Sequence, residues 1–123
     1  MTFAEELQSV LGVGLHPLGI TVHKGALNTP ANDEYYLTYD PYEETVVWAN
    51  NAPVIVQQEV QVRYFSKRTP LNSEHIEEVK RLLTGMGMRM DGTPEQTPML
   101  SATDYAGEIS EWSRTVAVNV EGN

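Results

Sequence analysis

The stretch from Val54 to Gly85 constrains the fold most, because its hydrophobic period changes once along its length. In its first half, apolar residues alternate at Val54, Val56, Val60, Val62 and Tyr64. This is the pattern of a strand with one buried face. In its second half they recur at Ile76, Val79, Leu82 and Leu83, which is the spacing of an amphipathic helix. Pro70 separates the halves, Asn72 can cap the helix, and Gly85 is expected to end it in a left-handed conformation. The segment therefore predicts a long strand followed by a helix.

The chain opens with a second predicted helix. Thr2 and Glu5 have the spacing of a capping box, in which each side chain satisfies a backbone N–H of the other residue. One apolar stripe follows at Phe3, Leu7, Val10 and Leu11. We expect this helix to end near Gly12 or Gly14.

Two strands and a turn are predicted between the helices, before the long strand. Ile20–His23 forms a short strand, and the aromatic segment Tyr35–Tyr39 forms another. Asp40-Pro41 is expected to interrupt the second strand, which resumes at Thr45–Trp48. A turn over Ala49–Pro53 then leads into the long strand. We predict an extended hairpin whose arm, near residues 40–53, is irregular and acidic.

The last third of the chain completes the predicted sheet. Met88–Met90 forms a short strand that the Asp91-Gly92 turn signal closes, Leu100–Tyr105 is a further candidate, and Trp112–Val120 alternates apolar with polar residues. The order is helix, strand, strand, long strand, helix, strand, strand. Because turns join most of the strands, we expect an α+β fold: one domain over residues 1–123, with a mainly antiparallel sheet of four to five strands and two helices packed on one face.

The chain is acidic, and most of the excess charge lies in its first half. Eight Lys and Arg stand against 17 Asp and Glu, for a net charge of −9. Residues 1–62 hold one base and eight acids, and residues 63–123 hold seven bases and nine acids. This balance lacks the basic surplus that grips phosphates, although it suits a surface past which DNA slides without adhering. The 123 residues include no cysteine, which excludes disulfides, and no apolar run approaches the roughly 18 residues of a membrane helix. We expect a soluble protein.

Few side chains have the spacing that catalysis or metal binding requires. His75 and Glu78 share a helix face at i and i+3, yet a solvated first turn explains them better than a metal site. Asp40, Glu43 and Glu44 lack the D-x-D-x-D-G spacing of a calcium loop and are expected to be solvated acids of a turn. There is no G-x-S-x-G elbow for a nucleophile. The sequence predicts no catalytic residue, no metal and no cofactor, and therefore no enzyme.

The two tryptophans receive different predictions. Trp112 lies on the apolar face of the closing strand and is a candidate core residue. Trp48 lies beside a polar turn and is the better candidate for an exposed anchor at a protein contact.

Three blocks of the sequence, in this order, resemble the tail terminator, or tail completion, proteins of long-tailed bacteriophages. They are H-K-G-A at residues 23–26, E-Y-Y-L-T-Y-D at 34–40, and V-V-W-A-N-N-A-P-V-I-V-Q-Q-E-V-Q-V-R-Y-F-S-K at 46–67. In that family a helix of E-E-V-K-R-L-L type, a short Gly-Met segment and a closing strand follow, so the resemblance covers nearly the whole chain. Its most specific part is V-Q-V-R-Y-F-S-K at 60–67, in which Arg63 stands where an acid is common in the family.

The resemblance implies a non-enzymatic virion structural protein. Such a protein forms a homohexameric ring that caps the tail tube, ends tube polymerisation and provides the surface that joins the tail to the head. Its partners would be further copies of itself, the tail tube protein and a head-completion or connector protein. DNA would pass through the lumen without specific binding, and no membrane would be involved. The protein would reside in the virion tail, and in the host cytoplasm during assembly.

For the contact between subunits, we predict that the acidic arm of one copy faces a basic cluster of the next. The candidate interface residues are Asp40, Glu43, Glu44, Trp48, Arg63, Lys67 and Arg68. Two alternatives stay open. One is another phage head–tail connector or minor capsid protein of similar fold. The other, from a different class, is a small bacterial binding or hydrolytic domain that uses the acidic, tyrosine-rich region Tyr35–Glu44.

Overall fold

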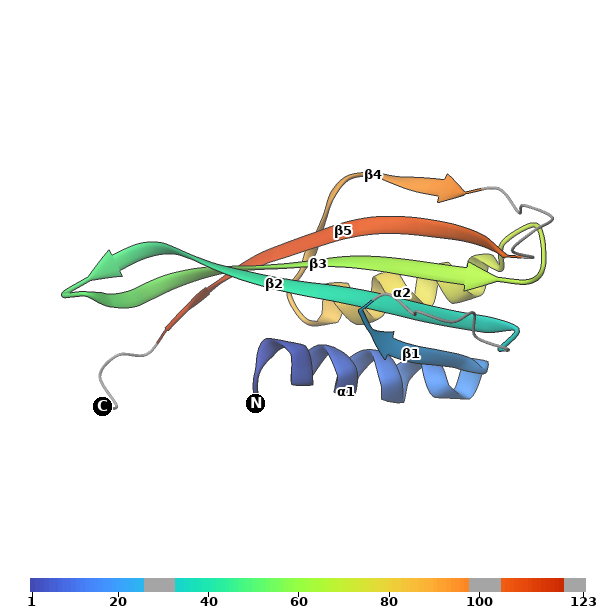
Figure 1. Ribbon diagram of the computed structural model, residues 1–123, viewed down its shortest axis with the longest axis horizontal. Coiled ribbons are helices and arrows are strands. Elements are labelled where there is room, and N and C mark those ends of the chain that lie inside the picture. The colour runs from blue at the N-terminus through green and yellow to red at the C-terminus, as the bar shows by residue number, and fades with distance from the viewer. Residues whose placement is uncertain (26–32, 98–104, 119–123) are drawn as a thin grey trace.

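The described part of the chain folds into a five-stranded mixed sheet with two α-helices, an α+β architecture (Figure 1). The computed structural model describes residues 1–25, 33–97 and 105–118. Its elements are α1 (Phe3–Leu15), the 3₁₀-helix η1 (His16–Leu18), β1 (Ile20–Lys24), β2 (Tyr35–Ala49), β3 (Ala52–Ser66), α2 (Ser73–Gly85), β4 (Arg89–Thr97) and β5 (Ala106–Ala117). The predicted order of helices and strands is confirmed.

The strands lie in the order β1-β2-β3-β5-β4. Three neighbouring pairs are antiparallel, but β1 pairs with β2 in parallel, from Ile20 beside Tyr35 to Lys24 beside Tyr39. The prediction of a mainly antiparallel sheet is therefore correct for the hairpin and the β5 side and wrong for β1. Parallel strands are usually joined by a crossover helix, and no helical period stands between these two strands in the sequence.

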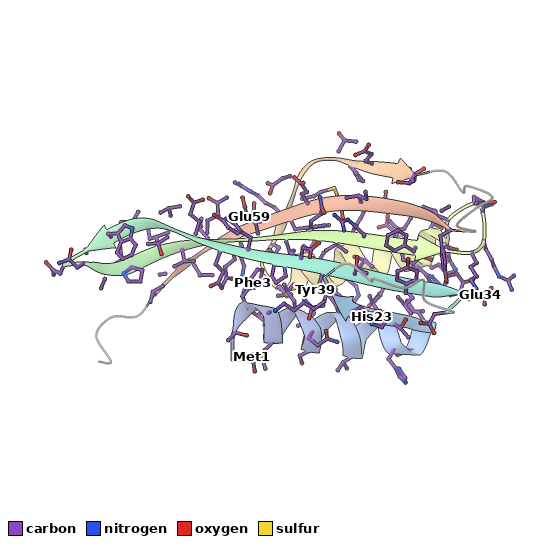
Figure 2. All side chains as sticks on the ribbon, viewed as in Figure 1. Met1, Phe3, His23, Glu34, Tyr39 and Glu59 are labelled. Carbon is purple, nitrogen blue, oxygen red and sulfur yellow. The ribbon has the colours of Figure 1, made fainter. Side chains whose placement is uncertain are left out.

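Both helices cover the same face of the sheet (Figure 1). α1 buries one residue per turn, at Phe3, Leu7, Leu11 and Leu15, and α2 buries His75, Val79 and Leu83. The sheet residues that meet them are Ile20, Leu37, Tyr39, Val60, Val62, Tyr64 and Trp112. Phe3 and Tyr39 lie between α1 and the sheet (Figure 2). Each fully buried large side chain contributes roughly 1.5–3 kcal/mol relative to an exposed one, so this layer is the main source of stability. Trp112 is a core residue, as predicted.

Local signals place the helix starts correctly and the helix ends to within about a residue, although the left-handed conformation expected at Gly85 is found at Gly87 instead. The Thr2–Glu5 capping box is present, and Asn72 Oδ1 accepts the Glu74 N–H at 2.9 Å. α1, however, continues through Gly12 and Gly14 to Leu15. α2 includes Gly85, and the left-handed residue after it is Gly87 (φ 83°).

The continuation of α1 has a physical reason at its contact with α2. A Cβ atom at Gly14 would lie 2.7 Å from both methyl groups of Leu82 on α2. A glycine therefore lets the two helices approach closely, and packing of Leu15 outweighs the weak helix propensity of the two glycines.

β2 is one continuous strand, and the predicted interruption at Asp40-Pro41 is wrong. β1 pairs with β2 only as far as Tyr39, so β2 is an edge strand from Asp40 onward. A proline is tolerated at an edge because its missing N–H is not needed by a neighbouring strand. The irregularity of the hairpin lies further out, where the register shifts between Thr45 and Trp48.

The last two strands are longer than predicted. The Asp91-Gly92 signal produces a register shift within β4, between Asp91 and Glu95, rather than its end. β5 begins at Ala106, six residues before the predicted start, because Gly107 and the polar residues after it hide the alternation. Most of the candidate strand 100–105, and the end of the one predicted over 112–120, lie outside the described residues.

Candidate interaction surfaces

The most distinctive feature of the molecule is the hairpin arm, which we define as residues 43–58 of β2, β3 and their turn. It projects beyond the ends of both helices (Figure 1). Its tip turn is Asn50-Asn51, and both residues have positive φ values, 53° and 64°. This is the conformation of a two-residue turn whose twist matches that of the strands, so the predicted turn over Ala49–Pro53 is confirmed. The arm is a paired hairpin up to this turn, and the predicted irregularity is present as the register shifts between Thr45 and Trp48.

The outer part of the arm is apolar rather than acidic. Residues 45–58 contain no charged side chain, although 20% of the whole chain is charged. Trp48 is 61% exposed, and Val46, Val47 and Ile55 are also exposed. The acidic character predicted for the arm is confined to its base, at Asp40, Glu43 and Glu44. The sequence signal that could have revealed the apolar tip is this uncharged run itself.

The face of the sheet that the helices cover continues onto the arm. Residues paired across neighbouring strands point to the same face, and Glu43, Gln58 and Arg114 form one such row on the helix side. The next helix-side row outward is Thr45, Val56 and Val116, all half-buried. Val118 lies beyond them and donates its N–H to the Val54 carbonyl at 2.9 Å. An apolar strip thus extends past the point where the helices stop.

Arg114 marks the end of the helical layer. Its guanidinium donates to Glu6 on α1 at 2.6 Å, to Gln58 Oε1 at 2.7 Å and to the Met86 carbonyl after α2 at 2.6 Å. It also lies 5.3 Å from the ring centroid of Phe3, within the range of a cation–π contact. Gln58 in turn donates to Glu43 at 2.7 Å. This network joins both helices to the base of the arm, and no motif in the sequence indicated it.

The predicted basic cluster is divided between two places. Arg63 lies on the helix-free face of β3, 3.6 Å from Asp40 of the same chain and 2.5 Å from Gln61 Oε1. Lys67 and Arg68 follow β3 at the other end of the sheet from the arm tip. Lys67 lies 5.6 Å from the Tyr105 ring centroid, and Arg68 pairs with Glu34, which is labelled at that end in Figure 2. The structure therefore brings Arg63 and Asp40 together within one chain and keeps Lys67 and Arg68 far from the arm tip.

The three acids at the base of the arm do not converge. Asp40 and Glu44 lie on the helix-free face by strand alternation, whereas Glu43 lies on the helix side. A carboxylate pair for acid–base chemistry requires two carboxyls that face one reacting group. Among the described residues, no group of three or more His, Cys, Asp or Glu side chains is arranged to hold a metal ion.

His75 is buried, and the prediction of a solvated first turn for it is wrong. Its Nδ1 lies 2.7 Å from the Tyr64 hydroxyl, and the Tyr35 ring meets it edge-on at 4.6 Å between centroids. Burial raises the pKa of Tyr64 to about 12, so the hydroxyl keeps its proton, and the hydroxyl and Nδ1 share one hydrogen bond whose direction follows the imidazole tautomer. Burial also lowers the pKa of His75, and the nearby Glu74 carboxylate only partly offsets this. His75 is a neutral core residue.

A groove lies at the end of the domain opposite the arm. It has a volume of about 510 Å³ and runs between the first half of α2, the end of β4 and the beginning of β5. Its apolar lining is Pro70, Leu71, Ile76 and Ala106, with Gln96 and Glu108 among the polar groups. The sequence did not indicate this groove, because its walls come from three separated segments.

Comparisons with known proteins add no assignment. Neither a protein-family model nor a curated protein matches the chain. Within the described part of the chain, neither helix combines the length and the hydropathy that crossing a membrane demands.

Proposed function

We propose that this chain is a self-assembling structural component of a virion. More particularly, we propose that it is the tail terminator of a long-tailed bacteriophage. Copies of the chain form a ring, expected to be hexameric, that caps the tail tube, stops its polymerisation and offers the joining surface to the head. Its partners are other copies of itself, the tail tube protein and a head-completion or connector protein. DNA passes the lumen without being held.

The observation that carries this proposal is the hairpin arm with its uncharged, exposed tip. Monomeric proteins rarely leave contiguous apolar side chains on a rigid projection, and such features mark contacts with other proteins. Trp48, the most exposed residue of this group, belongs to the residue type most enriched at the energetic centres of interfaces. Residues 46–58 of the arm also belong to the block 46–67 that resembles tail terminators, and the most specific part of that block, at 60–67, follows the arm along β3.

The proposed contact between copies differs from the charge pairing expected from the sequence. Arg63 has its carboxylate partner, Asp40, within the same chain. Glu43 and Glu44 at the base of the arm remain candidates for Lys67 and Arg68 of a neighbour, but exposed pairs of this kind are worth little each and are screened by salt. The energy of the contact must come mainly from Trp48 and its apolar neighbours, with the charges selecting the orientation.

Tail length is the test. In lysates of a phage that lacks this protein, negative-stain images should show tubes of uncontrolled length without heads, and purified protein added early should restore the normal length. Tails of normal length that fail to attach to heads would instead favour the connector alternative. Tails of normal length that carry heads would refute the proposal.

A further inference from the structure

We infer that the arm tip of one copy docks into the groove between α2 and β4–β5 of a second copy. The arm tip comprises residues 45–56, and the groove is the one lined by Leu71, Ile76 and Ala106. The contact is heterologous, because it joins two different surfaces. The inference deepens the proposed function by naming the subunit contact, but it would hold for any role in which the chain assembles with itself.

Within residues 1–25, 33–97 and 105–118, no helix covers the arm tip. The helical layer ends at Arg114, where the first turn of α1 and the residue after α2 both meet the guanidinium. Beyond that point the helix-side strip of Thr45, Val56 and Val116 continues without a helix above it (Figure 1). On the sheet's other side, Val47 and Ile55 pair across the strands and are both exposed. Apolar groups on both sides of a thin hairpin suit insertion between two walls.

The groove is too far away to receive the arm of its own chain. β3 has 15 residues, with the arm tip at Ala52 and the groove beside Ser66, which pairs with Ala106. A strand rises about 3.3 Å per residue, so the two ends of β3 are separated by roughly 45 Å. The strand that separates them is part of the central sheet and cannot fold back. The arm and the groove can therefore meet only between copies.

The chemistry of the groove fits the tip. Pro70, Leu71 and Ile76 give the groove an apolar strip among its polar lining residues, and this strip matches an uncharged hairpin end. The volume of about 510 Å³ lies within the roughly 300–1,000 Å³ of pockets that take small-molecule ligands, which is room for an indole. A buried indole needs an acceptor for its N–H, and the Glu108 carboxylate in the groove can accept that of Trp48. The rim of the groove carries both signs of charge: Lys80 lies 3.6 Å from Glu77, and on the loop that leads to the groove Arg68 pairs with Glu34. Lys67 and Arg68 are the basic groups there that the acids at the arm's base would meet.

The geometry also explains why such a contact propagates. A tip at one end and a receptor at the other leave every added copy with one free tip and one free groove. Heterologous contacts of this kind either close into a ring or continue as a filament. The proposed ring is the closed case.

The absence of cysteine makes a direct test possible. Ala49→Cys places one thiol beside Trp48 without removing the indole, and Gln96→Cys places another in the groove of the same chain. With a short bismaleimide, the double variant should give a ladder of covalent dimers, trimers and larger species that ends at a limiting size. The matched control pairs Ala49→Cys with Val13→Cys on the outer face of α1, 74% exposed, and should give no ladder.

A second experiment measures affinity by adding Trp48→Ala to the Ala49→Cys/Gln96→Cys chain. Loss of an interface tryptophan of this kind should weaken association about 30-fold or more and shift the ladder to correspondingly higher concentration. Unchanged circular dichroism would show that each variant is folded.

Four results would overturn the inference: dimers formed by Ala49→Cys alone, an equal ladder from the Val13→Cys control, no ladder at concentrations where light scattering detects assemblies, or a wild-type chain that stays monomeric with and without the tube protein. The tail-length test is independent of these outcomes. If tails reach their normal length but no arm–groove cross-link forms, this contact is refuted and the proposed function is retained.

Discussion

Replacement of Arg114 by methionine should destabilise the folded chain strongly, because this guanidinium holds both helices to the sheet. Its side chain is only 14% exposed, and it donates three hydrogen bonds of 2.6–2.7 Å, to Glu6, Gln58 and the Met86 carbonyl. Methionine keeps the apolar stem but leaves all three acceptors without their donor.

The expected loss follows from burial. Removing one partner of a fully buried ion pair costs about 3–5 kcal/mol. The Glu6 side chain is 34% exposed and can be partly rehydrated, which reduces the penalty. We therefore expect the free energy of unfolding to fall by about 2–3 kcal/mol, close to the value of one or two hydrogen bonds to a charged group. With an m-value of about 2 kcal/mol per M urea, the midpoint should fall by about 1 M or more.

The assay is urea unfolding monitored by circular dichroism at one fixed protein concentration. The matched control is Arg81→Met, which makes the same chemical change in the exposed pair with Glu78 on α2, where Arg81 is 69% exposed. Surface pairs of this kind contribute little, so its midpoint should stay at the wild-type value. Equal losses in the two variants, or no loss in Arg114→Met, would refute the reasoning that burial sets the strength of this network.

Three further predictions concern pH, helix packing and charge. Because the pKa of folded His75 is below the ordinary 6.5, the protein should lose stability as the pH falls from 6.5 towards that lowered value. His75→Phe should flatten this part of the plot of urea midpoint against pH. Parallel plots for the wild type and the variant would contradict this prediction. Gly14→Ala should lower the melting temperature, because the added Cβ would lie 2.7 Å from Leu82. Gly12→Ala should keep or raise the melting temperature, because its Cβ would meet only the movable end of Gln8. The reverse order of melting temperatures would be inconsistent with the close helix contact. Lys67→Glu with Arg68→Glu should hinder assembly in light scattering, most strongly at low salt, and unaltered assembly at moderate salt would count against a role for these two charges at the contact.

Local sequence signals were enough for the elements whose structure depends on near neighbours. The capping box at Thr2, the cap at Asn72 and the alternation through Val60 each correspond to what the structure contains. The order of elements followed from them. These predictions succeed because the hydrogen bonds and the buried face they describe lie within a few residues of the signal.

The features that the sequence failed to predict depend on contacts between residues that are distant in the sequence. Gly107 does not resemble a strand residue. It is needed in β5 because a Cβ there would lie 2.8 Å from the Tyr64 carbonyl and 3.2 Å from the Phe65 ring of the neighbouring strand. His75 follows a helix cap and resembles a surface residue, yet Tyr64, eleven positions earlier, supplies its buried partner. The parallel placement of β1 likewise leaves no trace in the period of its five residues.

The candidate interaction surfaces were predicted only in part. Trp48 is exposed on a hairpin arm, as expected from the polar turn beside it. The apolar character of the tip was not predicted, because the acids at the base led us to expect an acidic arm along its whole length. The groove was not predicted because residues near 71, 96 and 106 meet only in the folded chain. Whether Asp40, Glu43, Glu44, Arg63, Lys67 and Arg68 take part in subunit contacts stays a prediction.

Native mass spectrometry of the wild-type chain beside Trp48→Ala, each alone and with the tube protein, tests most directly whether copies assemble through the arm. We predict a wild-type assembly of six chains that is absent or strongly depleted in the variant at the same concentration, while both monomers carry the charge-state distribution of a folded protein. Identical assemblies from the two proteins, or wild-type monomers under every condition, would contradict the account.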